Sequence, residues 1–295
     1  MKVLVTGSSG QVGRDLIDVL DGVVPPGGSP EFQSKLEGTS FEVIGVSHHD
    51  LDVTDLAHVE NALERVRPDV VINLSAYTAV DKAESEPEAA ELVNATAVGY
   101  LSSASAKVGA RFIAVSTDYV FDGEKGQSYT ETDSPNPQSS YGRTKWHGEQ
   151  LCSPADTIVR TSWVMGVRGK TVGKVIAERA KTGETVRFVD DQRGSVTLAS
   201  DLAVALATLA IDPPGGVWHV ANSGSATWFE VAQWIGELYG RPDDFATAIK
   251  TADLDPQPAA KRPTRSDLNT DKFAAKYFAL PDWREGLIRF VEGLA

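Results

Sequence analysis

The chain has 295 residues, 41% of them hydrophobic and 23% charged, a composition typical of a globular protein with a sizeable core. Its 41 Asp and Glu residues outnumber its 28 Lys and Arg residues, and the net charge of −13 argues against nucleic-acid binding, because a phosphate backbone requires a basic surface. A self-repelling acidic surface and adaptation to high salt both account for this excess of acidic residues.

The N-terminus enters a predicted strand at residues 2–6 without the layout of a signal peptide. No apolar run reaches the roughly 20 residues that cross a bilayer, so we expect no membrane partner. Cys152 is the single cysteine and excludes an intramolecular disulfide. These features together predict a cytoplasmic protein.

Strand and helix patterns alternate along the first 160 residues. After the first strand, a helix is predicted near 11–21, and a Gly- and Pro-rich loop insertion at 21–40. The later strands are predicted at 41–46, 69–74, 111–115 and 156–160, and the later helices near 55–66, 86–109 and 138–151. Unbroken apolar strands between helices indicate an α/β fold, a Rossmann-type doubly wound parallel sheet with helices on both faces.

The pattern changes after about residue 160, where Pro and Gly separate shorter elements. We predict a dinucleotide-binding Rossmann domain at residues 1–160, to which later segments contribute the final strands. Residues 161–295 are predicted to form mainly a smaller, substrate-binding lobe interleaved with the sheet.

Three glycines, Gly7, Gly10 and Gly13, follow the first strand and open the first helix. Glycine permits a tight turn and close approach of the backbone, and a helix N-terminus presents free N–H groups and a positive dipole to a pyrophosphate. This placement predicts a dinucleotide site that also includes Gln11 and Val12.

The end of the second strand bears on the choice of nicotinamide cofactor. Ser47, His48 and His49 follow this strand, and no carboxylate stands there to repel a 2′-phosphate. NADPH is therefore expected, with NADH as the alternative, because Asp50 and Asp52 follow close behind and weaken this argument. Asp52 and Val53 are expected beside the adenine. Helix caps and solvated turn residues are the other interpretation of this segment.

Tyr141 and Lys145 lie four residues apart, on one face of a predicted helix. The preceding strand ends at Thr117, and ligands of open α/β sheets bind at the carboxyl ends of strands. We therefore expect Tyr141 to donate a proton during carbonyl reduction, and Thr117 to orient the carbonyl oxygen. Lys145 is expected to lower the pKa of the phenol and to bind the nicotinamide ribose. An exposed Tyr–Lys contact without chemistry is the alternative.

The glycine motif, the Ser116-Thr117 pair and the Tyr-x-x-x-Lys motif together resemble the extended short-chain dehydrogenases. Longer runs resemble, more narrowly, the dTDP-4-dehydrorhamnose reductase family, and the likeness extends from residue 1 to about residue 292. These runs are residues 73–87, 116–123, 160–164, 191–192, 262–263, 268–270 and 280–283.

The resemblance implies that NADPH or NADH reduces the 4-keto group of a nucleotide sugar, dTDP-4-dehydro-6-deoxy-L-mannose, to dTDP-L-rhamnose. It further implies cofactor contacts from the segment after the third strand, namely Leu74, Ser75, Ala76 and Tyr77. The substrate residues that it implies are Thr117, Asp118, Trp163 and Arg262. A guanidinium pairs with phosphate oxygens in a planar, bidentate way, so Arg262, with Lys261 and Arg265 beside it, is expected to bind the diphosphate.

Two departures from the family limit this resemblance. Residues 21–40 are longer than the usual connection, although a surface insertion is tolerated. Some bacterial members dimerise through a Mg²⁺ held by N-terminal and C-terminal glutamates, and the corresponding residues here are Asp15 and Glu292. Both are equally interpretable as helix-surface charges, so Mg²⁺ and a homodimer are secondary expectations.

Two other functions stay open at this point. An epimerase or dehydratase of the same superfamily usually needs a further acid or base beside the tyrosine. Asp118 supplies a carboxylate, but we expect it to point away from the ring. The second alternative is a non-catalytic, NADP-binding partner protein, because the regulatory subunit of methionine adenosyltransferase resembles these same reductases.

Overall fold

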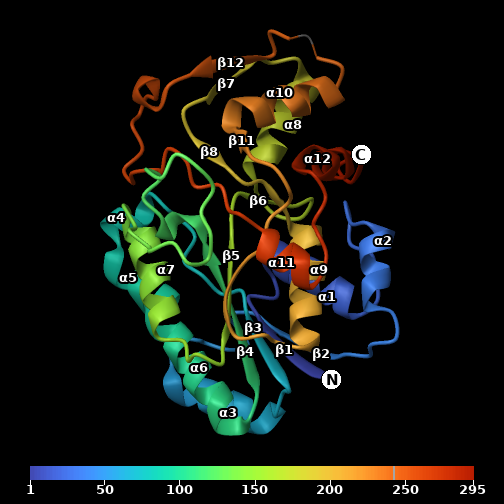
Figure 1. The fold of residues 1–295 in the computed structure, drawn as a ribbon, viewed down its shortest axis with the longest axis vertical. Coiled ribbons are helices and arrows are strands. Elements are labelled where there is room, and N and C mark those ends of the chain that lie inside the picture. The colour runs from blue at the N-terminus through green and yellow to red at the C-terminus, as the bar shows by residue number, and fades with distance from the viewer. Residues whose placement is uncertain (242) are drawn as a thin grey trace.

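A six-stranded parallel sheet forms the centre of the computed structural model, which describes residues 1–241 and 243–295 (Figure 1). Its strands lie in the order β10-β5-β4-β3-β1-β2, and every neighbouring pair is parallel. The strands are β1 (Lys2–Thr6), β2 (Glu42–Val46), β3 (Val70–Asn73), β4 (Arg111–Thr117), β5 (Thr157–Thr161) and β10 (Gly216–His219). The predicted fold class is confirmed, as are the five strands predicted before residue 162.

The order of the strands reverses at β1. β2 lies on one side of β1, whereas β3, β4, β5 and β10 follow on the other, and Val3 pairs with both Val43 and Val70. At such a switch point, the connections leave the carboxyl ends of the strands in opposite directions and open a crevice between them. The sheet therefore creates a binding crevice where β1 and β3 end.

Alternate residues of each strand face opposite helix layers. Val3 and Val5 pack with the layer that contains α1 and α9, whereas Leu4 packs with the layer that contains α3 and α6. The first layer consists of α1 (Gln11–Leu20), α9 (Ala199–Ile211) and α11 (Asp271–Lys276). The second layer consists of α3 (Leu56–Val66), α6 (Ala97–Val108) and α7 (Ser140–Gln150). The helix predicted near 86–109 is divided into α5 (Pro87–Glu91), a π-helical turn η2 (Leu92–Thr96) and α6.

The insertion at residues 21–40 is more ordered than the predicted loop. It contains α2 (Pro30–Gln33) and the 3₁₀ turn η1 (Ser34–Leu36), because Leu36 is apolar and packs against the central core. The carbonyl of Gly27 accepts hydrogen bonds from Ser200 Oγ at 3.1 Å and from Arg289 Nη1 at 2.6 Å. The insertion therefore joins the sheet domain to the C-terminal helix α12 (Trp283–Glu292).

A smaller lobe lies beyond the carboxyl ends of the strands, at the top of Figure 1. Its core includes Ile176, Phe245 and Trp283. Besides α12, its helices are α8 (Val172–Thr182) and α10 (Trp228–Leu238), and its strands are β6 (Val164–Met165), β7 (Val186–Val189), β8 (Arg193–Gly194), β9 (Thr197–Leu198), β11 (Ala226–Thr227) and β12 (Ala246–Ile249). The later half of the chain also supplies β10, α9 and α11 to the sheet domain. No helix of the described residues has the length and apolar character to cross a membrane.

Candidate active site

A cleft of about 820 Å³ opens at the carboxyl ends of the strands, beneath the lobe. Most of the residues that we predicted for the site line it. These are Gly7, Gly10, Gln11, Val12, Gly13, Asp52, Val53, Leu74, Ser75, Ala76, Thr117, Asp118, Tyr141, Lys145 and Trp163. Two predicted residues, Tyr77 and Arg262, do not line the cleft.

The glycine loop between β1 and α1 has room for backbone but not for side chains. Gly7 has φ +64°, and a Cβ there would lie 2.8 Å from the carbonyl carbon of Leu74. A Cβ on Gly13 would lie 2.3 Å from the carbonyl oxygen of Gly7. Gly10 is the N-cap of α1 and has no side chain to bond the first N–H groups of the helix. These N–H groups face the cleft, and the loop therefore fits a pyrophosphate.

Directly after β2, the residue that lines the cleft carries an imidazole, and the carboxylate residue that also lines the cleft, Asp52, comes four positions later. His48 lines the cleft, and Asp50 turns back to accept hydrogen bonds from the N–H and Oγ of Ser47 at 2.9 and 2.7 Å. These bonds lower the pKa of the Asp50 carboxyl. Asp52 lines the cleft and accepts hydrogen bonds from Thr54, which lower the pKa of its carboxyl. The side chain of Asp50 thus caps the turn at residues 47–50.

The segment after β3 follows the glycine loop across the switch point. Leu74, Ser75 and Ala76 line the cleft, but the side chain of Tyr77 turns away and donates to Glu86 Oε2 at 2.7 Å. The backbone of Tyr77 exchanges hydrogen bonds with Asn94, whose Nδ2 also donates to Thr144 Oγ1 of α7 at 3.1 Å. Asn94 lies in the π-helical turn, and our sequence analysis missed it. The available signal was a lone asparagine inside an apolar helical pattern.

Helix α7 approaches its neighbours unusually closely. A Cβ on Gly142 would lie 2.2 Å from the carbonyl oxygen of Tyr119, and a Cβ on Gly148 would lie 2.2 Å from the carbonyl oxygen of Asn94. The helix begins at its N-cap Ser139, whose Oγ accepts from the N–H of Gly142 at 3.1 Å. These contacts fix the position of the face that carries Tyr141 and Lys145.

Thr117, Tyr141 and Lys145 meet at the end of β4. Thr117 lies close enough to the Tyr141 phenol to lower its pKa, and the Tyr141 ring lies edge-on to Tyr119 with the ring centroids 5.6 Å apart. Lys145 is buried, and its Nζ donates to the carbonyl oxygen of Val115 at 2.7 Å. The expected convergence of Thr117 and Tyr141 is therefore present in the structure.

The electrostatics of this trio differ from our expectation. Burial raises the pKa of Tyr141 to about 12, Thr117 opposes part of this shift, and the Asp118 carboxylate adds to it. Lys145 is not among the groups that shift the pKa of this phenol, because its ammonium is directed to the Val115 carbonyl. Burial lowers the pKa of Lys145 to about 8. The pKa of Tyr141 is thus raised, whereas we expected Lys145 to lower it.

Asp118 begins the 3₁₀ turn η3 (Asp118–Val120) and is buried. Its Oδ2 accepts from Ser266 Oγ at 2.5 Å, and its Oδ1 accepts from Thr117 Oγ1 at 3.1 Å. Burial raises the pKa of the carboxyl to about 6, although the hydrogen bonds from Ser266 and Thr117 oppose the shift. The carboxylate therefore joins Thr117 to the C-terminal segment.

Trp163 forms the lobe side of the cleft in a strained conformation. It has φ +42°, which is rare for a bulky residue and is found mostly at functional sites. Its indole stacks on Trp228 with the ring centroids 4.1 Å apart, and a Cβ on Gly194 would lie 2.6 Å from the same indole. Trp228 and Gly194 therefore hold Trp163 over the cleft, and neither was predicted from the sequence.

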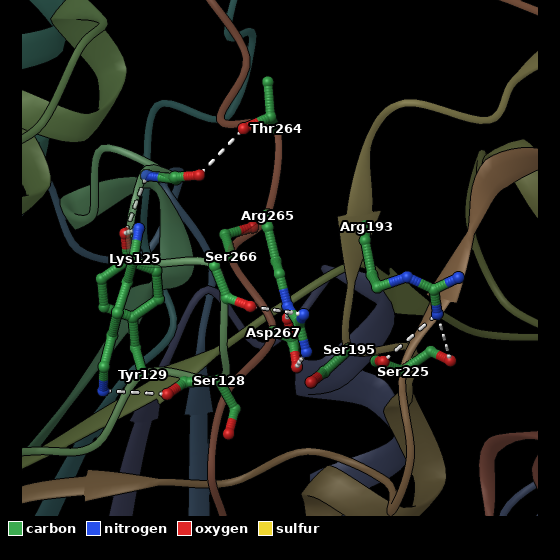
Figure 2. Close-up of polar contacts among 12 residues, drawn as sticks. Lys125, Ser128, Tyr129, Arg193, Ser195, Ser225, Thr264, Arg265, Ser266 and Asp267 are labelled. Atoms are coloured by element: carbon green, nitrogen blue, oxygen red, sulfur yellow. Dashed lines mark hydrogen bonds and ion pairs between the residues drawn. The ribbon is translucent and has the colours of Figure 1, made fainter.

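The two arginines of the basic cluster around Arg262 are paired with carboxylates. Arg262 donates from Nη1 and Nη2 to the two carboxylate oxygens of Asp81, each at 2.5 Å, and this pairing lowers the pKa of Asp81 to about 2. Figure 2 shows Arg265 turned toward Asp267, to which its Nε donates at 2.7 Å. Lys261 Nζ donates to the neutral amide oxygen of Gln138 at 3.3 Å. The positive charge of the cluster is therefore smaller than we expected.

The carboxylates considered for Mg²⁺ do not form a metal site. Asp15 is buried rather than on the helix surface; burial raises its pKa to about 7, and its nearest cation is Arg168 Nη1 at 3.7 Å. Glu292 is the last residue of α12. Among residues 1–241 and 243–295, no group of three or more His, Cys, Asp or Glu side chains is arranged to hold a metal ion.

Comparison with known proteins gives one consistent result. The family described as "RmlD substrate binding domain" matches residues 27–295. The dTDP-4-dehydrorhamnose reductase of Escherichia coli is 35% identical, covering 100% of this chain and 98% of its own. The enzyme of the same name from Streptomyces griseus is 38% identical, covering 96% and 91%. A crystal structure of dTDP-4-dehydrorhamnose reductase from Bacillus anthracis in complex with NADP is 33% identical, with a TM-score of 0.87 and 98% of each chain covered.

Proposed function

This chain belongs to the family of the RmlD substrate binding domain, whose members include dTDP-4-dehydrorhamnose reductases, and from that premise we propose the following function. The protein is an NADPH-dependent oxidoreductase that reduces the 4-keto group of dTDP-4-dehydro-6-deoxy-L-mannose to give dTDP-L-rhamnose. The observation that carries the proposal is the meeting of Thr117, Tyr141 and Lys145 in the cleft that the glycine loop also lines.

Each member of the trio has one task in the reduction. Bound NADPH supplies a hydride to the carbonyl carbon. Tyr141 donates its phenolic proton to the oxygen on which negative charge develops, and Thr117 holds that oxygen by a hydrogen bond. A phenol with a pKa of about 12 is fully protonated at neutral pH, which is the state that a proton donor requires before reduction. Lys145 brings a positive charge to the cofactor side of the site.

The cofactor fits the cleft through this chain's own residues. The first N–H groups of α1 bind the pyrophosphate, and the glycine loop leaves the space that a side chain would fill. Leu74, Ser75 and Ala76 line the cleft beside the glycine loop, and we assign Asp52 and Val53, which also line it, to the adenine. Support for NADPH comes from the NADP complex of the Bacillus anthracis relative and from the missing carboxylate after β2.

His48→Asp is expected to weaken NADPH binding by about tenfold or more, because it places a carboxylate opposite the 2′-phosphate. NADH lacks that phosphate, so its dissociation constant should change much less. His49→Asp is the matched control, since His49 does not line the cleft. Fluorescence titration of each variant with both cofactors measures the ratio. Equal losses for NADPH and NADH would remove His48 from 2′-phosphate recognition.

Arg262→Ala is expected to raise KM for the nucleotide sugar by about tenfold or more, because a charge-assisted bond to the diphosphate is lost. The carboxylate of Asp81 would also be left without its partner. NADPH binding should hardly change, because the cofactor phosphates lie at the glycine loop. Arg265→Ala is the matched control, since that guanidinium is held in the same manner, by Asp267 and the Gly126 carbonyl, but is not assigned to the diphosphate.

Steady-state kinetics with both substrates separates these outcomes. Asp81→Asn frees Arg262 from its carboxylate, so it should lower KM for the nucleotide sugar if the guanidinium binds the diphosphate. A loss that falls on NADPH in Arg262→Ala, with the sugar nucleotide unaffected, would show that the lobe assignment is wrong.

The decisive test of the function is NADPH oxidation by the purified chain with enzymatically generated dTDP-4-dehydro-6-deoxy-L-mannose, followed by product identification. One NADPH consumed for each dTDP-L-rhamnose formed is the expected result. An epimerase or dehydratase would convert the sugar without net consumption of NADPH. A non-catalytic NADP-binding partner protein would bind the cofactor and oxidise none of it.

A further inference from the structure

A buried ionic cluster lies behind the catalytic face of α7. Glu149 accepts hydrogen bonds from Arg160 Nε at 2.9 Å and Arg160 Nη2 at 2.6 Å, and from Ser116 Oγ at 2.5 Å. The side chains of Arg160 and Glu149 are only 4% and 6% exposed, so the pair is removed from water. Our sequence analysis assigned no role to Glu149, and the catalytic trio does not use it.

The cluster connects two strands of the sheet to one helix. Ser116 of β4 and Arg160 of β5 are cross-strand neighbours, and both side chains reach the same carboxylate. Glu149 itself lies one helical turn after Lys145, on the same face of α7. A single carboxylate thus ties the catalytic helix to the carboxyl ends of β4 and β5.

Two successive residues at the end of β4 are bonded to two turns of α7. Val115 accepts from Lys145 Nζ, and Ser116 donates to Glu149. A shift of α7 along the strand would break both bonds together. The bond to Glu149 is the one that is further anchored, because Arg160 holds the carboxylate in place.

Stability alone does not explain a charged pair at this position. Desolvating two charges costs more than a surface ion pair returns, and apolar side chains of similar volume often serve as well or better. Nη1 of Arg160 is buried and has no hydrogen-bond partner, so the pair is not even fully satisfied. A charged carboxylate at this position therefore calls for a role beyond packing.

We propose that Glu149 is a positioning residue for the reaction: anchored by Arg160 and Ser116, it holds α7 in register with β4 and places a buried negative charge one helical turn from the Lys145 ammonium. This inference rests on the proposed reductase function, in which Lys145 must carry its charge to the cofactor side of the cleft. Glu149 does not line the cleft, and it acts through Lys145 and Ser116.

The groups around Lys145 support a role for charge. Burial lowers the pKa of Lys145 to about 8, while Glu149 and, to a smaller extent, Cys152 raise it. Among the described residues, Glu149 is thus the only carboxylate that shifts the pKa of Lys145. Arg160 does not contribute to this shift. The other titratable groups near this part of the chain are Tyr141 on α7, Asp118 on η3 and Asp156 near Cys152. Removing the Glu149 charge should therefore let Lys145 lose its proton at lower pH.

The experiment measures the titration of Lys145 directly. The protein is labelled with ¹³C at the lysine side chains, the Lys145 signal is identified by its loss in Lys145→Met, and its midpoint is followed by NMR without ligand. Glu149→Gln keeps an acceptor for Ser116 and removes the charge, so the midpoint should fall by about one pH unit. The basic limb of kcat/KM should move to lower pH by a similar amount.

Two further variants separate charge from packing. Glu149→Gln leaves Arg160 as an unpaired buried charge and is at risk of misfolding, so the double variant Glu149→Gln/Arg160→Met removes both charges at similar volume. It should show the same lowered midpoint. Ser116→Ala keeps the charged pair but removes one bond, so the Lys145 midpoint should stay at the wild-type value.

Each outcome bears on one of the two proposals. A double variant that is folded and has the wild-type Lys145 midpoint would overturn the role of Glu149, whatever its melting temperature. A lowered midpoint in a protein whose wild type oxidises no NADPH would support the role of Glu149 and refute the reductase function. A midpoint lowered equally by Ser116→Ala would assign the effect to helix position rather than to charge, and would overturn the charge role.

Discussion

Tyr141→Phe is expected to lower kcat by at least about 10²-fold, in line with the loss of a general acid. The substitution removes one oxygen and leaves a ring of nearly the same volume, so the edge-on packing against Tyr119 should be kept. Affinity for NADPH should change little, because we assign the cofactor mainly to the glycine loop and the segment after β3. The loss is thus expected in the chemical step alone.

Single-turnover kinetics with the nucleotide sugar, beside fluorescence titration with NADPH, measures the two quantities separately. Tyr119→Phe is the matched comparison, because it removes a neighbouring phenolic oxygen while Tyr141 keeps its proton. A smaller loss is expected for Tyr119→Phe. Turnover of Tyr141→Phe near the wild-type rate would show that another group supplies the proton, and Asp118, with its pKa of about 6, would be the first to examine.

The sheet and the cofactor loop were predictable because their signals are local. Each strand of the sheet domain is an unbroken apolar run, and alternate residues such as Val3 and Leu4 are buried in opposite layers. Gly7 is required by the positive φ of the turn after β1, and Gly13 by the close approach of α1 to the Gly7 carbonyl. Both positions belong to one strand–helix unit. Sequence spacing alone therefore places the glycine loop at the end of β1.

The supports of the site were not predictable, since they join residues far apart in the chain. Asn94 bonds both Tyr77 and Thr144, and its role depends on a π-helical turn that sequence periodicity does not reveal. The pairing of Arg262 with Asp81 spans 181 residues, and it reduced the positive charge that a count of neighbouring Lys and Arg residues had predicted. Long-range pairing, rather than local propensity, decided each of these cases.

For the Tyr–Lys pair, too, the sequence predicts the local placement but not the long-range contacts. Spacing placed Tyr141 and Lys145 on one helical face, and the structure brings both to the cleft. Spacing did not show that the ammonium would be directed to the Val115 carbonyl, away from the phenol. The electrostatic effect of the lysine on the tyrosine therefore depends on what else the cleft contains when the reaction takes place.

Lys145→Met is expected to lower kcat by at least about 10²-fold and to weaken NADPH binding by about tenfold. Methionine has a similar length and no charge, so the loss reports on the ammonium rather than on volume. An ammonium has three donors, and within the described structure the Lys145 ammonium makes one hydrogen bond, to Val115. Two donors are therefore left for the ribose hydroxyls of the cofactor.

In Lys145→Met, the loss of turnover and the loss of NADPH affinity both come from removing one ammonium group. Lys174→Met is the matched control, because it removes an ammonium group elsewhere. Lys174 also donates to a backbone carbonyl, that of Val167 at 2.9 Å, but it does not line the cleft. Its removal should leave both turnover and NADPH affinity near the wild-type values.

Because burial lowers the pKa of Lys145 to about 8, wild-type activity should fall as the pH rises through that value, and Lys145→Met should lack this limb. A Lys145→Met enzyme that bound NADPH normally and lost only turnover would show that the ammonium acts on the phenol and not on the cofactor.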